Sequence, residues 1–154
     1  MKQNNWIRTL LKSYNYLERI VRGIDKTVKK ISYNSFYYNS ANYVSTYALS
    51  NKLIDLNERK VLLINTKILV DKMLKYIGNK GAKYLTLRFV DGLKNEEIAI
   101  SQKKSIRTVS RNVHNYLLKA QEFLLKQGFD SQKLFKLFRE EQWVLDIYYG
   151  EKEW

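Results

Sequence analysis

The spacing of apolar side chains near the N-terminus limits the fold of this chain more than any other feature. Between positions 5 and 31, successive apolar residues are alternately three and four residues apart: Ile7, Leu10, Tyr14, Leu17, Val21, Ile24, Val28 and Ile31. On an α-helix this spacing places all of them along a single stripe, as the a and d positions of a heptad. The pattern therefore predicts one long helix over residues 5–31.

The apolar stripe of residues 5–31 has two interpretations. It is either a coiled-coil seam that joins two copies in a homodimer, or the inner face of a helix that packs on its own domain. We favour packing within the chain, because Gly23 weakens the helix by about 1 kcal/mol. The stripe is too narrow for a helix that lies in a membrane interface, so no membrane partner is expected.

A polar and aromatic stretch over residues 32–47 breaks this periodicity. Its Ser and Asn side chains can bond to nearby backbone groups and so compete with the helix. We therefore expect a linker or irregular loop, which completes a first domain of residues 1–50. The tyrosines of this stretch either stack on unpaired bases or cover the edge of a helical core.

Helical spacing returns after residue 50. From about Asn57 to Ile77, two adjacent apolar stripes predict a helix with a wide face that must be buried; they comprise Val61, Ile64 and Ile68, and Leu62, Leu69, Met73 and Ile77. Gly78 to Gly81 has the composition of a turn. Shorter helices are expected at residues 82–90 and 95–101, a longer one from a Ser105 cap to Lys126, and a last one from a Ser131 cap to about Tyr149.

No strand pattern persists anywhere, so the predicted fold class is all-α, a helical bundle. Residues 51–127 are predicted to form a helical domain with a helix-turn-helix at 95–120. Residues 128–154 are predicted to form a C-terminal helix and an acidic tail. Three interpretations of the acidic tail around Trp143 and Trp154 stay open: part of the core, a contact with another protein, or a lid that competes for the basic helix.

The charge of the chain favours a polyanionic partner. It carries 28 basic and 15 acidic residues, a formal net charge of +13, which suits nucleic acid or, less often, an anionic membrane. An AT-rich coding sequence also enriches lysine, and we ascribe roughly half of the charge to that bias. Residues 80–127 carry ten basic and four acidic side chains, whereas residues 128–154 carry four and six. Codon bias alone would spread lysine more evenly, so the placement favours nucleic acid.

Residues 95–120 have the pattern of two helices joined by a short polar turn. A helical wheel of residues 105–120 groups the side chains that should face the domain, namely Ile106, Val109, Val113, Tyr116 and Ala120. Arg107, Arg111 and His114 lie opposite, with Ser110 and Asn115 on the flanks. Residues 98–121 include five basic and no acidic side chains, whereas a solvated face usually mixes both signs. Such a unit can place its second helix in the major groove of DNA.

The outward face of this second helix has side chains that can bind DNA. Arg pairs with guanine and Asn with adenine, while Ser and Thr bind phosphate or base edges. The Ser105 hydroxyl is expected to cap the first turn, whose N–H groups can bind a phosphate. The candidate DNA-binding residues are Lys103, Lys104, Ser105, Arg107, Thr108, Ser110, Arg111, His114, Asn115 and Lys119.

A series of short motifs over residues 82–122 occurs in an order that is itself informative. The motifs are Leu87-Arg88-Phe89, Asp91-Gly92-Leu93, Glu96-Glu97-Ile98-Ala99, Ser105, Thr108-Val109 and His114. In this order and spacing they resemble region 4 of bacterial sigma-70-type factors. The resemblance implies promoter DNA as the ligand, RNA polymerase as a partner, and Arg107, Thr108, Ser110, Arg111, His114 and Asn115 as groove residues. The layout of the chain resembles phage-type activators of the ArpU and RinA kind.

The sequence departs from the family pattern around the turn. Lys94, Gln102, Lys103 and Lys104 stand where the family usually has a capping Ser or Thr, a core Leu, a turn Gly and a core Ile or Val. Lys103 would occupy a left-handed backbone position, which costs a residue with a side chain about 1 kcal/mol. Either the turn has a different structure here, or residues 102–104 serve to contact phosphate.

Other chemistry has little support in the sequence. There is no cysteine and His114 is the single histidine, so neither a catalytic triad nor a zinc site is expected. The adjacent pairs Glu96-Glu97 and Glu140-Glu141 point about 100° apart on a helix and make poor acid–base dyads. We expect no enzyme, no cofactor, and a cytoplasmic location, because neither a signal peptide nor a membrane-spanning run is evident. The alternative function is a helical protein–protein interaction module whose helix-turn-helix does not contact DNA.

Overall fold

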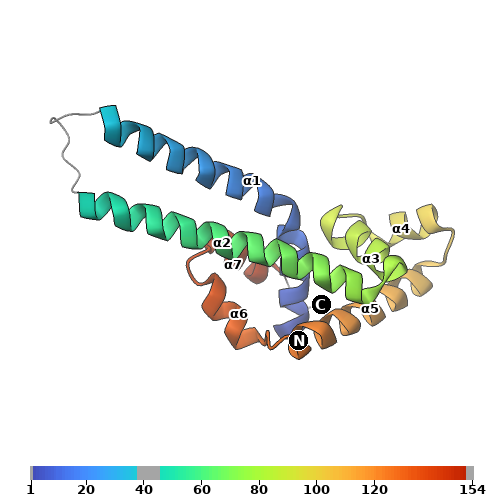
Figure 1. Ribbon diagram of the computed structural model, residues 1–154. Helices are drawn as coiled ribbons and strands as arrows, with labels where there is room; N and C mark the ends of the chain where they lie inside the picture. The colour runs from blue at the N-terminus through green and yellow to red at the C-terminus, as the bar shows by residue number, and fades with distance from the viewer. Residues whose placement is uncertain (1, 38–45, 152–154) are drawn as a thin grey trace. The chain divides into compact units, whose positions relative to one another are not determined.

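All regular structure in the described part of the chain is helical. The computed structural model describes residues 2–37 and 46–151, and its elements are α1 Lys2–Tyr37, α2 Thr46–Ile77, α3 Asn79–Leu85, the π-helical turn η1 Thr86–Val90, α4 Asn95–Gln102, α5 Ile106–Lys126, α6 Ser131–Phe138 and α7 Gln142–Gly150 (Figure 1). The predicted all-α class is confirmed.

The chain divides into two compact units. The first takes its residues from Met1–Asn15 and Ile68–Trp154, and the second comprises Tyr16–Lys67. Helices α1 and α2 therefore each contribute one part to both units. The three-part division predicted from composition, with boundaries after residues 50 and 127, stays a prediction.

The second unit is an antiparallel pair formed by the later part of α1 and the earlier part of α2 (Figure 1). Lys60 Nζ lies 2.6 Å from Asp25 Oδ1, and Lys67 Nζ lies 3.9 Å from Glu18 Oε1. The later residue of α2 thus pairs with the earlier residue of α1, as antiparallel helices require. The predicted a and d residues Leu17 and Ile24 are 1% and 4% exposed within the single chain. This burial supports packing within the chain as the role of the stripe.

Both long helices extend further than the sequence predicted. Helix α1 continues to Tyr37 and α2 begins at Thr46, eleven residues before Asn57. The predicted linker is therefore wrong for residues 32–37 and 46–47, while residues 38–45 lie outside the described residues. The preference of Ser and Asn for non-helical backbone is a fraction of about 1 kcal/mol per residue. Extending an existing helix avoids the cost of nucleation and overcomes that preference.

Of the two apolar stripes predicted on α2, the first is exposed and the second is buried only at Met73 and Ile77. Val61, Ile64 and Ile68 are 48%, 39% and 45% exposed. The buried positions follow a different line, which includes Leu63, Thr66, Val70, Met73 and Ile77. The prediction of one wide buried face is therefore wrong, because at 100° per residue the buried positions lie on nearly the opposite side of α2 from Val61, Ile64 and Ile68.

Two predicted helix ends also need correction. The predicted turn from Gly78 to Gly81 is confined to Gly78, at φ 93°, and α3 resumes at Asn79. The helix predicted over 82–90 is α3 followed by the wider turn η1, in which Asp91 N donates to Thr86 O. A single residue with positive φ is enough to change the direction of the chain between two helices, and glycine adopts this conformation without a Cβ penalty.

The last predicted helix, 131–149, is in fact two. Asp130, rather than Ser131, caps α6 by accepting from Lys133 N at 2.8 Å. The chain then breaks over residues 139–141 before α7. At the break Glu141 is 1% exposed and accepts a hydrogen bond from Trp143 Nε1 at 2.7 Å. Neither glycine nor proline marks this break, so composition gave no signal for it.

An aromatic cluster holds the N-terminal part of α1 against α6 and α7 within the first unit. The Trp6 ring is fully buried, with centroids 4.9 Å from Phe135, 5.7 Å from Phe138 and 4.7 Å from Tyr148. Gln3 adds a polar link, because its Nε2 donates to Phe129 O and its Oε1 accepts from Ser131 Oγ. The first turns of α1 thus belong to the unit that contains α4 and α5.

Candidate nucleic-acid interface

Helices α4 and α5 pack directly against each other in the first unit (Figure 1). Ile98 and Ala99 face inward from α4, and Val109, Val113 and Leu117 face inward from α5. Burying such side chains removes apolar surface from water and fixes the rotation of each helix about its axis. The rotation of α5 in turn determines which of its polar residues point outward.

The turn between α4 and α5 keeps a left-handed residue in spite of its unusual sequence. Lys103 has φ 52° and ψ 46°, and among the described residues it is the one non-glycine residue with positive φ. Lys104 N donates to Ala99 O at 3.0 Å, and Lys103 N donates to Ile100 O at 3.3 Å. This bonding pattern is a Schellman motif, in which glycine is the usual residue. The left-handed backbone expected at Lys103 is therefore present, and contact of residues 102–104 with phosphate stays a prediction.

Replacing Lys103 with glycine should stabilise the protein by about 1 kcal/mol, because the left-handed conformation carries no Cβ penalty for glycine. Urea denaturation of both proteins measures this difference. Lys104→Gly is the matched control, since Lys104 has no positive φ and glycine there should give no gain. A Lys103→Gly protein no more stable than Lys103→Ala would contradict the strain argument.

The predicted cap of α5 is confirmed. Ser105 Oγ accepts from Thr108 N at 3.1 Å and lies 2.8 Å from Thr108 Oγ1. The hydroxyl of Thr108 is therefore engaged within the first turn, and its side chain is half-buried. At α4 the cap is incomplete, because lysine has no acceptor: Lys94 N donates to Glu97 Oε2 at 2.7 Å, without the reciprocal bond.

The structure places nine of the ten predicted DNA-binding residues on the exposed surface, all except Thr108. Arg107, Arg111 and His114 are exposed, as the helical wheel predicted. Ser110 is exposed too, but its Oγ accepts from Asn95 Nδ2 at 3.0 Å. That bond ties α5 to the first turn of α4.

The wheel was wrong at one end of α5. Ile106, predicted to face the domain, is 49% exposed, and the unpredicted Leu117 is 3% exposed. Ile106 is the first residue of α5 and follows directly on the exposed turn residues 103–105. A wheel assigns direction only, and a residue at a helix end has fewer neighbours to cover it.

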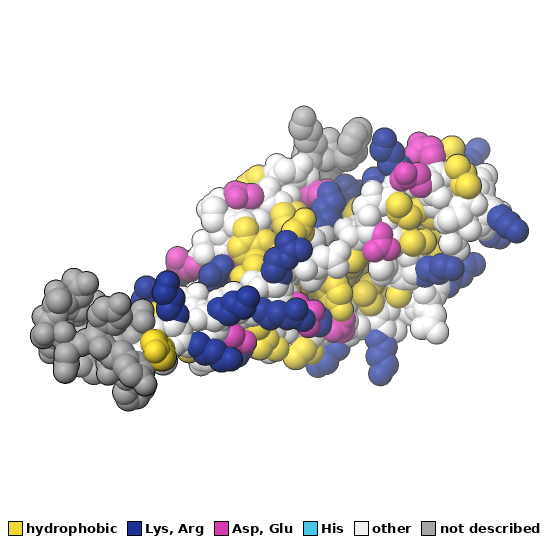
Figure 2. Space-filling view, turned by 90° about the horizontal axis from the view of Figure 1, so that it is seen from above, with side chains coloured by type: hydrophobic (Ala, Val, Ile, Leu, Met, Phe, Trp, Pro, Cys, Tyr) yellow, Lys and Arg dark blue, Asp and Glu magenta, His cyan; other side chains and the backbone are white. Residues whose placement is uncertain are grey.

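The outward arginines of α5 have no acidic partner. Neither Arg107 nor Arg111 makes an ion pair with any described residue. At the other end of the same helix, Lys126 Nζ lies 2.8 Å from Glu122 Oε1, and this hydrogen bond lowers the pKa of Glu122. The first three turns of α5 thus have uncompensated positive charge, whereas its last turn does not. On the face drawn in Figure 2, Lys and Arg side chains project in several places, with hydrophobic side chains exposed between them.

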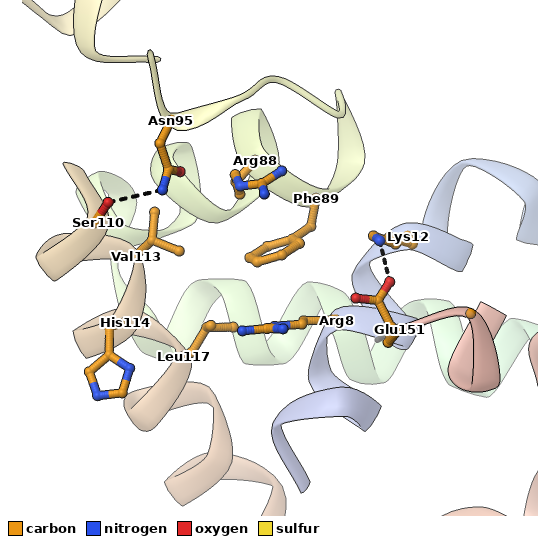
Figure 3. Close-up of a pocket in the computed structure, with 11 residues that line it drawn as sticks. Arg8, Lys12, Arg88, Phe89, Asn95, Ser110, Val113, His114, Leu117 and Glu151 are labelled. Carbon is orange, nitrogen blue, oxygen red and sulfur yellow. Dashed lines mark hydrogen bonds and ion pairs between the residues drawn. The ribbon is translucent and has the colours of Figure 1, made fainter. Parts of the chain in front are cut away.

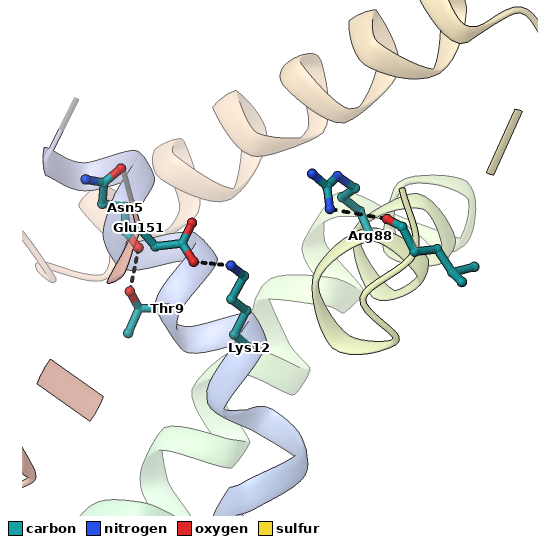
Figure 4. A network of polar contacts seen from close by, with 6 residues as sticks. Asn5, Thr9, Lys12, Arg88 and Glu151 are labelled. Carbon is teal, nitrogen blue, oxygen red and sulfur yellow. Dashed lines mark hydrogen bonds and ion pairs between the residues drawn. The ribbon is translucent and has the colours of Figure 1, made fainter. Parts of the chain in front are cut away.

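A cavity of about 540 Å³ opens beside α5. Its lining comes from both ends of the chain and the middle, and includes Arg8, Lys12, Arg88, Phe89, Asn95, Ser110, Val113, His114, Leu117, Gly150 and Glu151 (Figure 3). Lys12 pairs with Glu151, and Arg88 Nη1 donates to Leu93 O at 3.2 Å (Figure 4). Residues more than 75 positions apart form this site, so no local motif could have predicted it.

Among the described residues, no three His, Asp or Glu side chains gather closely enough to bind a metal ion. In the same part of the chain, none of the helices is both long and apolar enough to cross a bilayer.

Comparison of the chain with known proteins gives no relative on which a function could rest. No protein-family model matches it, and neither does any curated protein or solved structure.

Proposed function

We propose that this protein is a sequence-specific DNA-binding transcription regulator, sigma-factor-like, that acts in the cytoplasm at promoters with RNA polymerase. The observation that carries the proposal is the pair Arg107 and Arg111, exposed on α5 and without an ion pair among the described residues. A basic helix face used for protein contact would more often be covered or paired. Phosphate and guanine are the ligands that suit free guanidinium groups in this setting.

The proposed binding mode follows from the placement of the ten candidate residues. Helix α5 would enter the major groove with its N-terminal turns, so that Arg107, Arg111 and Asn115 reach base edges. Lys103 and Lys104 lie on the exposed turn before the helix and would contact phosphates. The contacts of α5 with base edges would give sequence preference, and the contacts of the two lysines with phosphates would give affinity for any sequence.

A protein–protein interaction module is the second candidate. Two apolar side chains flank the turn and favour it: Ile100 is 80% exposed and Ile106 is 49% exposed. In this alternative the turn between α4 and α5 binds another protein, and the arginines of α5 contribute little. A homodimer through residues 5–31 has weaker support, because Leu10, Leu17 and Ile24 are already buried within one chain.

Selection from a random pool of duplex DNA, followed by titration of the selected site, tests the first candidate. Arg107→Ala and Arg111→Ala should each weaken binding by about 1–3 kcal/mol, roughly 5-fold to 150-fold, and relax the preference at one position. Lys103→Ala should weaken binding to all duplexes alike, because a phosphate contact is independent of sequence.

Lys126→Ala is the matched control, since Lys126 is also a basic residue of α5 but pairs with Glu122. This variant should bind the selected DNA with an affinity within about twofold of the wild type. Equal affinity of the wild type and the two arginine variants for the selected site would exclude α5 as the groove helix. Failure to select any site, with binding of a protein partner lost in Ile100→Asp, would favour the second candidate.

A further inference from the structure

The cavity beside α5 contains more positive charge than its surroundings neutralise. Arg8, Lys12 and Arg88 line it, together with His114, and Glu151 is the one carboxylate in the lining. Glu151 pairs with Lys12, and its side chain is 8% exposed. The two guanidinium groups therefore have no acidic counterpart among the described residues.

The two arginines lie close to the same aromatic ring. The guanidinium carbon of Arg8 is 5.9 Å from the centroid of Phe89, and that of Arg88 is 5.5 Å from it. Figure 3 shows Arg8 and Arg88 on opposite sides of this ring, with Asn95 and Ser110 beyond it. Contact with a ring face orients a guanidinium group but satisfies none of its N–H donors.

Polar atoms of the lining are buried without a partner. Arg8 Nε makes no hydrogen bond to an acceptor, and Asn95 Oδ1 receives none from a donor. The other amide atom of Asn95, Nδ2, donates to Ser110 Oγ. A buried donor without an acceptor costs about 1–3 kcal/mol, and more on a charged group. Arg88 makes one hydrogen bond, to Leu93 O, which leaves its other N–H groups available (Figure 4). The lining thus contains one buried guanidinium donor, Arg8 Nε, that no protein acceptor satisfies, and further N–H groups of Arg88 that make no hydrogen bond to a described residue.

We infer that this cavity is a binding site for an oxyanion, a phosphate or carboxylate group, whose oxygens accept hydrogen bonds from Arg8 and Arg88. Planar guanidinium groups match the geometry of both anions and bind them in pairs of hydrogen bonds. The anion is either part of a free small molecule or a backbone phosphate of bound DNA. The site does not depend on the proposed function, because its ligand groups lie outside the ten candidate DNA-binding residues apart from Ser110 and His114.

Glu151 would modulate this site. Its carboxylate is the one negative charge among the lining residues, pairs with Lys12, and belongs to the residue that follows α7. A like charge in the lining opposes an incoming anion, and removing it frees Lys12 as a third cation. The ion pair of Lys12 with Glu151 thus sets the affinity of the cavity.

Titration of the full chain with inorganic phosphate, followed by NMR, tests the inference. The signals to follow are the arginine Nε–H groups and the backbone amides of Ser110 and His114. We expect a saturable shift of the Arg8 Nε–H signal in the wild type. Arg8→Gln and Arg88→Gln should each weaken phosphate binding about tenfold, the usual loss for one charge-assisted hydrogen bond.

Glu151→Gln should change the affinity in the opposite direction, which separates an anion site from a general loss of structure. Arg22→Gln is the control, since Arg22 is an exposed arginine of α1 that pairs with Glu18, and it should have no effect. Addition of duplex DNA then identifies the source: displacement of phosphate indicates a backbone phosphate, and simultaneous binding indicates a free anion. Shifts that never saturate, or that are unchanged in all three cavity variants, would overturn the inference whether or not the protein binds DNA.

Discussion

Replacing Trp6 with alanine should lower the free energy of unfolding by about 3–5 kcal/mol, the usual loss for a large aromatic side chain removed from a core. Trp6 is fully buried, and its ring contacts Phe135, Phe138 and Tyr148. These residues come from α6 and α7, at the other end of the sequence from Trp6. The substitution would therefore detach the start of α1 from the C-terminal helices.

Urea denaturation followed by circular dichroism measures this loss. Tyr149→Ala is the control, because Tyr149 is also an aromatic residue of this region but is 70% exposed. It should change stability by no more than about 0.5 kcal/mol. A Trp6→Ala protein as stable as the Tyr149→Ala protein would show that the aromatic cluster is not the link between the two ends of the chain.

Adding a single methyl group at Gly81 should destabilise the protein by about 1–3 kcal/mol, as overpacking of a core does. A Cβ at this position would lie 2.5 Å from Tyr116 Cδ1 and closer still to Ile77 Cγ2. Gly81 belongs to α3, and Tyr116 belongs to α5, so the close approach of these two helices depends on the missing side chain. The backbone of α3 would have to move away from the candidate groove helix.

Gly23→Ala is a matched control of opposite sign. Nothing lies within 4 Å of a Cβ built at Gly23, which is an interior residue of α1. Alanine there should stabilise the protein by about 0.5–1 kcal/mol through its better helix propensity. If Gly81→Ala were neutral or stabilising in urea denaturation, the packing of α3 on α5 would be looser than these distances require.

The sequence predicted those features that depend on local chemistry. The periodicity of α1, the Ser105 cap and the extent of α5 follow from spacing and from one hydroxyl, and the structure has them where they were expected. The left-handed position at Lys103 was also identified, although its lysine suggested a different turn. Two hydrogen bonds of a Schellman motif compensate for a residue that is locally unfavourable.

The remaining features depend on contacts between distant residues. Exposure of Val61 on α2 depends on which neighbours cover that helix, and the spacing of apolar residues does not specify them. The break between α6 and α7 involves the buried Glu141, a residue type that usually indicates surface. The cavity brings Arg8 and Glu151 together from opposite ends of the chain, and no local pattern in the sequence could link them.

Chromatin immunoprecipitation with sequencing, on the wild type and on the Arg107→Ala, Arg111→Ala double variant, tests the role of α5 most directly. The predicted result is a set of enriched promoter sites that share one sequence motif, and loss of these sites in the double variant at equal protein level. The control is Lys126→Ala, whose lysine is already paired with Glu122 and which should keep the sites. Sites that persist unchanged in the double variant, or no enrichment with the wild type, would contradict DNA recognition by this helix.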